Sequence, residues 1–530
     1  MKKSVSFILA FLSIGFIFSQ WNYRVEIIAE SFENLPALHS YAMAQSQNEY
    51  LIIGGRKDGI HPRQPFAAFD ETDKNTRMYV INPVTKQVWG KDLNGLNAMI
   101  VEQLSSTNMN FHQVEDTLFI VGGYGYSTTA ADHKTYEYLT TISVDGIINA
   151  IKNQSDISAF IKQIKFDKFA VTGGHLTHMN KQFYLVGGHR FDGRYNPMGH
   201  STYTQEYTHE VRIFKINNSG NNPVVYDYSA IHDENHLRRR DYNLVPQIFP
   251  NGKKGFLISS GVFQKGADLP FLYPVQIHDT TITAITDFNQ YLSNYHSASV
   301  ALYDTKNKDM HSLFLGGLSQ YNYENEKLIK DDLVPFVKTI SLVTQSKNGD
   351  YSEYKLNESM PALLGSGAEF LTNPNLPRID DEIIDLNSIT ADSVVLGYVF
   401  GGIRSEDPNP FANNNISQTT ANPVLYKVRL IKDAQADTRY LQQIPDVKVY
   451  PNPNETGNVN VSFPFSLSKA EVYIYNSLGV LLQESHLDQQ SDRQFKFTIG
   501  SSIPAQMLFV QIKGDDGQIY RKTIVYKNLQ

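Results

Sequence analysis

The stretch "LFIVGGYGYS", residues 118–127, joins an apolar, strand-like run to a cluster of glycines. Glycines after a strand fit either a phosphate-binding loop or one copy of a repeat. An apolar run ending in Gly-Gly or Ser-Gly occurs six times, in LIIGGR (51–56), LFIVGGY (118–124), FYLVGGH (183–189), FLISSGV (256–262), LFLGGLS (313–319) and GYVFGGI (397–403). No copy is followed by the Gly-Lys-Ser/Thr of a phosphate loop, so we infer a repeat.

Each copy lies in the same order of expected strands. One short strand precedes it, in HSYAMAQ (39–45), TNMNFHQ (107–113), TGGHLTH (172–178), RDYNLVP (240–246), HSASVAL (296–302) and SGAEFLT (366–372). A polar loop, a third strand and a fourth strand follow, and Asp145-Gly146 and Asn348-Gly349 are hairpin signals between the last two. Four antiparallel strands repeated six times predict a six-bladed β-propeller.

The repeats resemble the kelch family, whose signature is an apolar strand ending in Gly-Gly, then a Tyr and a Trp. The first copy carries it fully, as Gly54, Gly55, Tyr79 and Trp89, and the other five lack the Trp. The resemblance implies a kelch-like propeller over residues 20–440, with glycines that give room for close packing at the strand end. We expect NYRVEII (22–28) to be the outer strand of the last blade, which joins the two ends of the ring.

The two ends of the chain predict export. A basic start and an apolar run read as a signal peptide over residues 1–19, and no transmembrane segment is expected. After a linker at 441–448, residues 449–530 resemble the type A C-terminal sorting domain of the type IX secretion system of Bacteroidetes-type bacteria. The matching residues are Tyr450-Pro451-Asn452-Pro453, YNSLG (475–479) and GQIYRKTIV (517–525). The resemblance implies a small β-sandwich, recognition by the secretion machinery, and a secreted or cell-surface protein; a carbohydrate-binding module is the alternative for this segment.

Composition limits the remaining function classes. The chain has 31 Tyr, 30 Phe and no Cys, which favours an all-β fold and excludes disulfides, Cys metal sites and a Cys nucleophile. The net charge is −7 and the longest basic block is LRRR (237–240), so nucleic acid is not an expected partner. HDENH (232–236) resembles a zinc-protease motif but lies in a loop, and the two histidines of HLTH (175–178) point to opposite faces of a strand. We therefore expect no metal and no cofactor.

The candidate site lies where the first strands begin, at the mouth of the central channel. Long polar loops at 56–76, 189–209 and 403–422 mark the same face. The polar residues expected to converge there are His39, Asn110, His175, Arg240, Asp241, Asn243, His296 and Glu369. We predict a glycan or protein ligand on this loop face. The alternative is a carbohydrate-active enzyme (epimerase, lyase or hydrolase) in which Glu369 and a histidine act as acid and base while Arg240 holds an anion.

Overall fold

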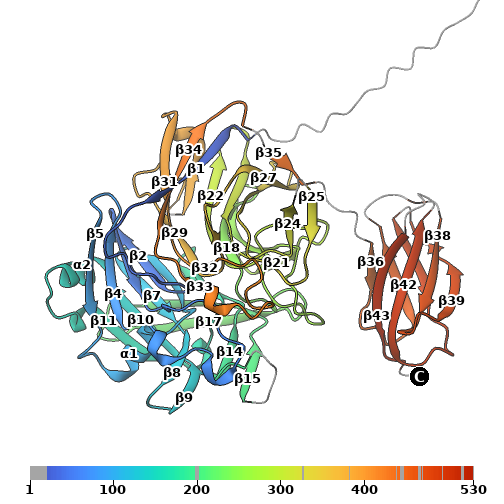
Figure 1. Ribbon diagram of the computed structural model, residues 1–530, viewed down its shortest axis with the longest axis horizontal. Coiled ribbons are helices and arrows are strands. Elements are labelled where there is room, and N and C mark those ends of the chain that lie inside the picture. Colours follow the sequence, from blue (N-terminus) through green and yellow to red (C-terminus); the bar gives the residue numbers. More distant parts are fainter. Residues whose placement is uncertain are drawn as a thin grey trace, which may run out of the picture. The chain divides into compact units, whose positions relative to one another are not determined.

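A computed structural model of the chain describes residues 21–528 except 197–201, 325–326, 381, 437, 442–446, 464–466, 468, 492 and 515–518. The signal peptide expected at 1–19 lies outside the described residues, as do residues 442–446 of the expected linker. The chain divides into two compact units, residues 1–441 and 442–530 (Figure 1). Both are built from β-strands, so the predicted all-β class is confirmed.

Within the described residues, the larger unit contains six large sheets, each built on four antiparallel strands. The first three sheets are β2 (Ala42–Ser46), β3 (Glu49–Ile53), β4 (Arg77–Asn82) and β5 (Gln87–Asp92); β6 (Asn110–Val114), β7 (Thr117–Val121), β10 (Tyr138–Ser143) and β11 (Ile161–Lys165); and β12 (His175–Met179), β13 (Gln182–Val186), β16 (Glu210–Asn217) and β17 (Val224–His232). Within each sheet, strands that follow one another in the sequence pair with one another.

The next three sheets repeat this order. They are β18 (Asn243–Ile248), β19 (Lys254–Ser259), β20 (Val275–His278) and β21 (Thr281–Ala284); β22 (Ala298–Asp304), β23 (Asp309–Leu315), β26 (Thr339–Gln345) and β27 (Tyr351–Ser359), extended by β30 (Ile383–Asp385) and β35 (Thr438–Tyr440); and β29 (Ala368–Thr372), β31 (Ser393–Gly401), β34 (Leu425–Lys432) and β1 (Tyr23–Glu30). The N-terminal strand β1 pairs with β34 along its whole length, which confirms the expected role of residues 22–28 as an outer strand of the last sheet.

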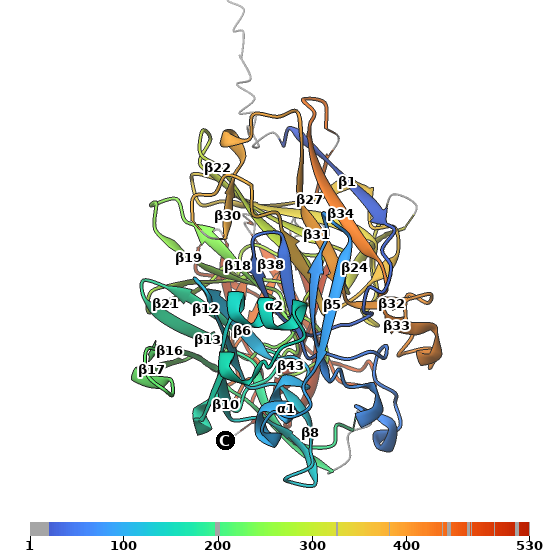
Figure 2. The same ribbon diagram turned by 90° about the vertical axis from the view of Figure 1, so that its left-hand side faces the viewer.

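Small sheets and helices lie in the connections. The small sheets are β8 (Tyr124–Ser127) with β9 (Asp132–Thr135), β14 (His189–Gly193) with β15 (Tyr203–Tyr207), β24 (Tyr321–Glu324) with β25 (Lys327–Lys330), and β28 (Leu363–Leu364) with β32 (Ile403–Ser405) and β33 (Thr419–Ala421). The helices are α1 (Ala98–Leu104), α2 (Val144–Lys152) and the 3-10 turns η1 (Pro65–Ala67), η2 (Glu71–Asp73), η3 (Ser158–Phe160), η4 (Asp167–Phe169), η5 (Leu386–Ser388) and η6 (Ile416–Gln418). Figure 2 shows α1 and α2 beside the blue and teal strands of the first two sheets.

The hairpin predicted at Asp145-Gly146 is wrong, because α2 begins there. The Ser143 side chain accepts a hydrogen bond from the Gly146 amide and caps the helix. Ile147, Ile148 and Ile151 follow at helical spacing and are buried. The hairpin predicted at Asn348-Gly349 is confirmed, since this pair lies in the turn between β26 and β27.

Backbone hydrogen bonds link the six sheets in a cycle. After each second strand, the amide of the second residue of the Gly-Gly or Ser-Gly pair donates to a carbonyl in the segment that leads into the next sheet. These bonds are Gly55 to Ser106 (2.8 Å), Gly123 to Val171 (3.1 Å), Gly188 to Arg239 (2.8 Å), Gly261 to Asn294 (3.1 Å), Gly317 to Leu364 (2.7 Å) and Gly402 to Leu38 (3.0 Å). The last bond returns from the sixth sheet to the first, so the order closes on itself.

A second ring of hydrogen bonds lies just before the first strands. One residue from each lead-in segment donates its amide to the carbonyl of the equivalent residue one sheet earlier. The bonds are Ser40 to Gly367, Asn108 to Ser40, Gly173 to Asn108, Asp241 to Gly173, His296 to Asp241 and Gly367 to His296, all between 2.9 and 3.2 Å. These lead-in residues were expected to be strand, but the first strands begin two or three residues later than the sequence suggests. The lead-in backbone is used to join sheets instead.

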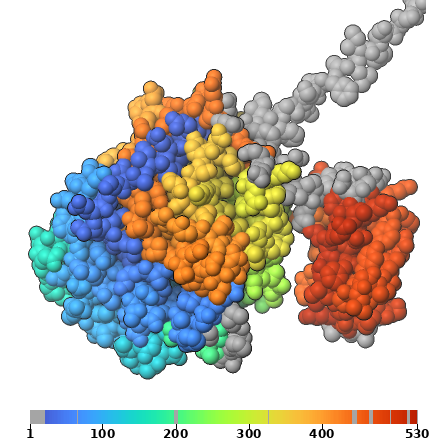
Figure 3. All heavy atoms as spheres, viewed as in Figure 1, coloured from blue at the N-terminus to red at the C-terminus, as the bar shows by residue number. Residues whose placement is uncertain are grey.

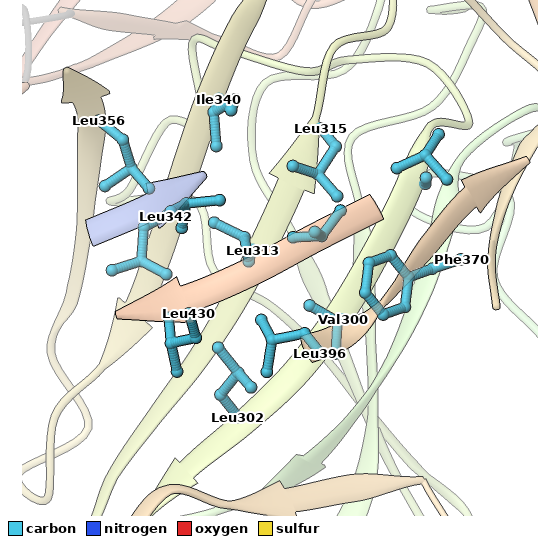
Figure 4. Packing of buried hydrophobic residues seen from close by; sticks show 14 of the residues in the cluster. Val300, Leu302, Leu313, Leu315, Ile340, Leu342, Leu356, Phe370, Leu396 and Leu430 are labelled. Atoms are coloured by element: carbon cyan, nitrogen blue, oxygen red, sulfur yellow. The ribbon is translucent and has the colours of Figure 1, made fainter. Parts of the chain in front are cut away.

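Apolar side chains fill the space between neighbouring sheets. Figure 4 shows Leu313 and Leu342 of the fifth sheet beside Leu396 and Leu430 of the sixth, all four in one buried cluster. Burial of such side chains contributes about 1.5–3 kcal/mol each relative to leaving them exposed. The core is therefore a series of layers between sheets, which leaves the first strands free to line a central space.

The smaller unit is a sandwich of two four-stranded sheets. One holds β36 (Lys448–Tyr450), β37 (Asn458–Ser462), β41 (Gln494–Thr498) and β40 (Asp488–Gln489), and the other β39 (Leu481–His486), β38 (Ala470–Tyr475), β42 (Gln506–Gly514) and β43 (Ile519–Tyr526). Alternating residues point inward, so Leu508, Val510 and Ile512 of β42 are buried while Met507 and Phe509 are exposed. This unit has a hydrophobic core of its own, formed by residues between 447 and 526.

Candidate functional site

A cavity of about 880 Å³ lies at the centre of the larger unit. Residues of the first strand of every large sheet line it, namely of β2, β6, β12, β18, β22 and β29. It reaches the ends of these strands that turn into the second strands, where exposed Gln47, Glu115 and Asn180 form part of its wall. We call this the turn end, and the opposite end, where the glycine pairs lie, the glycine end.

A second, much smaller cavity of about 30 Å³ lies toward the glycine end. Four residues line both cavities, namely Phe111, His175, His296 and Glu369. The last three form what we call the His–Glu cluster. It separates the two cavities, so any molecule in the large cavity meets this cluster at the inner end.

The His–Glu cluster joins side chains from three sheets. His296 Nε2 lies 3.1 Å from Glu369 Oε1. The rings of His175 and His296 meet edge to face, with centroids 5.0 Å apart. The Nε2–H group of His175 donates to the Tyr242 carbonyl at 2.6 Å, which fixes the tautomer and leaves Nδ1 as an acceptor. A sheet-three histidine is thereby connected through a sheet-five histidine to a sheet-six carboxylate.

The two histidines differ in charge. Burial, helped by the neighbouring His296, lowers the pKa of His175 to about 3, so this ring is neutral at neutral pH. Burial also acts to lower the pKa of His296, but the Glu369 carboxylate outweighs it and raises that pKa above its usual value. The cluster therefore combines a neutral ring with a second ring whose protonated form a carboxylate stabilises, a combination suited to moving a proton.

Arg240 does not join this cluster directly. It forms an ion pair with Asp241, lies 3.3 Å from the Tyr207 hydroxyl and stacks on Phe263. Asp241 lines the small cavity together with the cluster, whereas neither cavity is lined by Arg240 or His39. His39 instead lies 3.4 Å from Asp58, which Arg56 also holds. The predicted site residues thus fall into two groups. His175, Asp241, His296 and Glu369 all line the small cavity, whereas Arg240 and His39 line neither cavity.

The basic block that contains Arg240 is taken up by aromatic rings. Arg238 lies 4.0 Å from the Tyr207 ring centroid, and Arg239 lies 4.2 Å and 4.6 Å from the ring centroids of Phe271 and Tyr273. Arg239 is fully buried and donates to three backbone carbonyls. The arginines of this block therefore pack against aromatic rings and backbone carbonyls.

The predicted site residues Asn110 and Asn243 connect sheets. Asn110 donates to the carbonyls of Val121 in its own sheet and Val171 before the next. Asn243 accepts from the Ser297 amide at 2.9 Å, across to the fifth sheet. Both also line a cavity, Asn110 the small one and Asn243 the large one, but their amides are largely committed to the backbone.

The long loops at the glycine end pack on one another. Ile60 and Arg63 of the first sheet's loop donate to Thr419 and Ala412 of the sixth sheet's loop. The His61 ring lies among the rings of Phe69, Tyr195 and Phe411. Figure 3 shows orange residues of the sixth sheet against blue residues near the N-terminus. Residues of the loops expected to form a ligand-binding face thus contact one another.

A segment that sequence reasoning passed over contributes to the large cavity instead. The described residues between 373 and 392, which are all but residue 381, connect β29 to β31 and supply Arg378, Asp380 and Glu382 to the cavity wall. We call it the rim segment. Its length is the available sequence signal, because β2 and β3, like β6 and β7, are joined by only two residues.

Within the described residues, no group of three His, Asp or Glu side chains is arranged to hold a metal ion. In HDENH, Asp233 accepts from His236 across one turn of chain, at 2.9 Å. In HLTH, His175 contacts Tyr242 while the His178 ring stacks on that of His112. Nor does the described part of the chain hold a helix long and apolar enough to span a membrane.

Comparison with known proteins identifies the smaller unit. Residues 448–526 match the family described as a secretion system C-terminal sorting domain. Two of the motifs quoted above can be placed in it: residues 475–479 lead from the end of β38 into the turn before β39, and residues 519–525 of the last motif lie in β43. The chain is therefore exported, to the cell surface or into the medium.

No curated protein matches the chain. A solved structure titled "Structure of YjhT" is similar at 11% identity with a TM-score of 0.43, over 78% of this chain and 99% of that one.

Proposed function

We propose that the larger unit is a six-bladed, kelch-like propeller that binds a saccharide in its central cavity outside the cell. Two closed rings of backbone hydrogen bonds support the six-bladed arrangement, because each passes once through all six sheets and returns to the first. The kelch-like glycine pairs are the donors of one ring.

The observation that carries the binding proposal is the large cavity. Its volume of about 880 Å³ lies within the roughly 300–1,000 Å³ of small-molecule sites. Its wall mixes the Phe111 and Phe370 rings with hydroxyl, amide and charged side chains. Rings that cover sugar faces and polar groups that bind hydroxyls are what a saccharide requires.

A cavity-filling variant tests this proposal. Ser299→Arg places a large side chain on β22 in the cavity wall, and Thr85→Arg adds the same side chain at an exposed turn. A saccharide at 100 times its dissociation constant should stabilise the wild type and Thr85→Arg by about 2.7 kcal/mol in thermal-shift titrations. Ser299→Arg should lose the shift. Equal shifts in both variants would place the ligand elsewhere.

A second candidate function is catalysis on the bound saccharide, as an epimerase, lyase or hydrolase. The 3.1 Å contact between His296 and Glu369 at the inner end of the cavity favours it, because it pairs a proton donor with an acceptor. Glu369→Gln should lower the pKa of His296 in imidazole NMR titrations and abolish turnover while binding persists. Turnover that survives Glu369→Gln would show that Glu369 is not the catalytic acid or base, and a wild type that binds saccharides without turning them over would leave binding as the only function.

A further inference from the structure

The rim segment is a fixed part of the cavity wall. Its β30 pairs in parallel with the first strand β22 of the fifth sheet, and Ile383 and Ile384 are buried beneath it. From this anchor it reaches two other sheets. Asp380 forms an ion pair with Lys254 of the fourth sheet at 2.8 Å, and Glu382 lies 3.8 Å from His112 of the second. A connection that belongs to one sheet thus crosses the turn end of the cavity.

The charges on this wall are unbalanced. Four carboxylates, Glu115, Glu369, Asp380 and Glu382, face two permanent cations, Lys254 and Arg378. Burial, together with the neighbouring His178, lowers the pKa of His112 to about 3, so this ring brings no positive charge near Glu382 at neutral pH. Among these groups, negative charge exceeds positive charge even when His296 carries a proton. A cleft lined by one sign of charge raises the local concentration of ligands of the opposite sign.

We propose that the rim segment sets the charge specificity of the cavity, which accepts saccharides carrying amino groups and rejects uronic acids. The inference rests on the saccharide binding proposed above. Rejection has the same cause as attraction: an anionic ligand would have to enter beside Asp380 and Glu382, and like charges at short range oppose binding.

Three β-1,4-linked tetrasaccharides of equal length test the proposal on the full chain: oligomers of glucosamine, of N-acetylglucosamine and of glucuronic acid. Calorimetric titration at low ionic strength should give at least tenfold tighter binding of the glucosamine oligomer than of the glucuronate oligomer. The N-acetylated oligomer should fall between them. The preference should narrow in 1 M salt, where the Debye length is about 3 Å.

Variants locate the effect. Glu382→Lys should narrow or reverse the preference, and Lys254→Met, which removes a cation and leaves Asp380, should widen it. Glu406→Gln, an exposed acid on the loop at the glycine end, is the matched control and should leave all three affinities unchanged.

The results distinguish failure of charge selection from failure of saccharide binding. If the N-acetylated and glucuronate oligomers bind equally, and Ser299→Arg abolishes both, charge selection is overturned while saccharide binding stands. The same holds if Glu382→Lys and Lys254→Met change nothing. If none of the three oligomers binds, the charge selection and the saccharide site fall together.

Discussion

At the scale of single residues, the glycine pairs are required by the backbone of the next sheet. The first glycine of a pair has positive φ and lies against a carbonyl of the following lead-in segment, as Gly122 does against Val171 and Gly401 against Leu38. The sequence suggested that the missing Cβ gives room for close packing at the strand end. The structure shows that at Gly122 and Gly401 it makes room for a peptide carbonyl, whereas the fourth copy holds Ser260, also at positive φ, in the equivalent position.

Alanine substitution at two glycines separates the cost of backbone strain at positive φ from the cost of a steric clash with the next sheet. Gly122 and Gly95 both have positive φ, but a Cβ on Gly122 would lie 1.8 Å from the Val171 carbonyl oxygen, whereas one on Gly95 meets nothing within 4 Å. We expect Gly95→Ala to cost about 1–2 kcal/mol of backbone strain, and Gly122→Ala roughly 2–5 kcal/mol because overpacking is added. Urea unfolding of both variants measures this difference. Equal losses would show that conformation alone explains the glycine.

A buried carboxylic acid predicts a pH-dependent stability. Glu353 on β27 is fully buried and accepts hydrogen bonds from the amides of Tyr291 and Leu292 at 2.7 and 3.0 Å. Burial outweighs these bonds and raises its pKa from 4.5 to about 8. Between those values the folded protein keeps a proton that the unfolded chain has lost, so this contribution to stability is complete below pH 4.5 and disappears as the pH rises to about 8.

Replacing Glu353 isolates that contribution from the histidines, several of which have lowered pKa values and act in the opposite direction. Glu353→Gln should be more stable relative to wild type at pH 8 than at pH 5, in chemical unfolding at both values. The exposed Glu234→Gln is the control and should show no such difference. A wild type and Glu353→Gln that change in parallel from pH 5 to pH 8 would mean that Glu353 titrates normally.

The glycine pairs, Glu353 and the His–Glu cluster differ in how far the sequence predicted them. The glycine pairs were visible because glycine recurs at one position of each repeat. The burial of Glu353 was not visible in the sequence. Strand alternation predicts that polar residues of β27 face solvent, but residues 291–292 cover the face on which Glu353 lies. His175, His296 and Glu369 were found as polar residues near the start of first strands. These three side chains contact one another, whereas Arg240 pairs with Asp241. Both results depend on side-chain rotamers and on packing against neighbouring residues, which the spacing of residues in the sequence does not encode.

At the scale of elements, the strands were predictable wherever their pattern was local. The second strands were recognised from apolar runs that end in Gly-Gly or Ser-Gly, and residues 22–28 were expected to be the strand that joins the two ends of the ring. The error at Asp145-Gly146 came from weighing a turn dipeptide above the apolar spacing of Ile147, Ile148 and Ile151 that follows it. The helical period, combined with a capping serine, was the stronger signal.

The pairing of β1 with β34 predicts that one face of the N-terminal strand holds the last sheet together. Val25 is fully buried, whereas its neighbour Arg24 is exposed on the other face. Val25→Asp should lower the free energy of unfolding by about 3 kcal/mol or more, because it buries an unpaired charge. Arg24→Asp introduces the same side chain and should change stability by less than about 1 kcal/mol. Similar losses in the two variants would mean that β1 contributes little to the fold.

At the scale of the whole molecule, the repeat revealed the number and order of the sheets, but not which end of the central space would be open. That depends on loops of different sheets meeting. His61 among Phe69, Tyr195 and Phe411 brings three loops together at the glycine end, and the rim segment borders the turn end. Contacts between residues more than a hundred positions apart have no local signature, so neither the packing of the long loops on one another nor the cavity at the other end could be predicted. The ligand-binding face expected at the long loops stays a prediction.

The separate core of the smaller unit predicts that export and binding can be removed independently. Deleting residues 442–530 should leave the thermal transition of the larger unit unchanged, because the core of the sorting domain contains only residues 447–526, and should abolish export from the cell. In the full chain, Val510→Asp places a charge in that core and should unfold this unit alone, with the same loss of export. Lys513→Asp, on the exposed face of the same strand, should be exported normally. A shifted transition in the truncated chain would show that the larger unit depends on the sorting domain, and continued export would show that a signal elsewhere in the chain directs it.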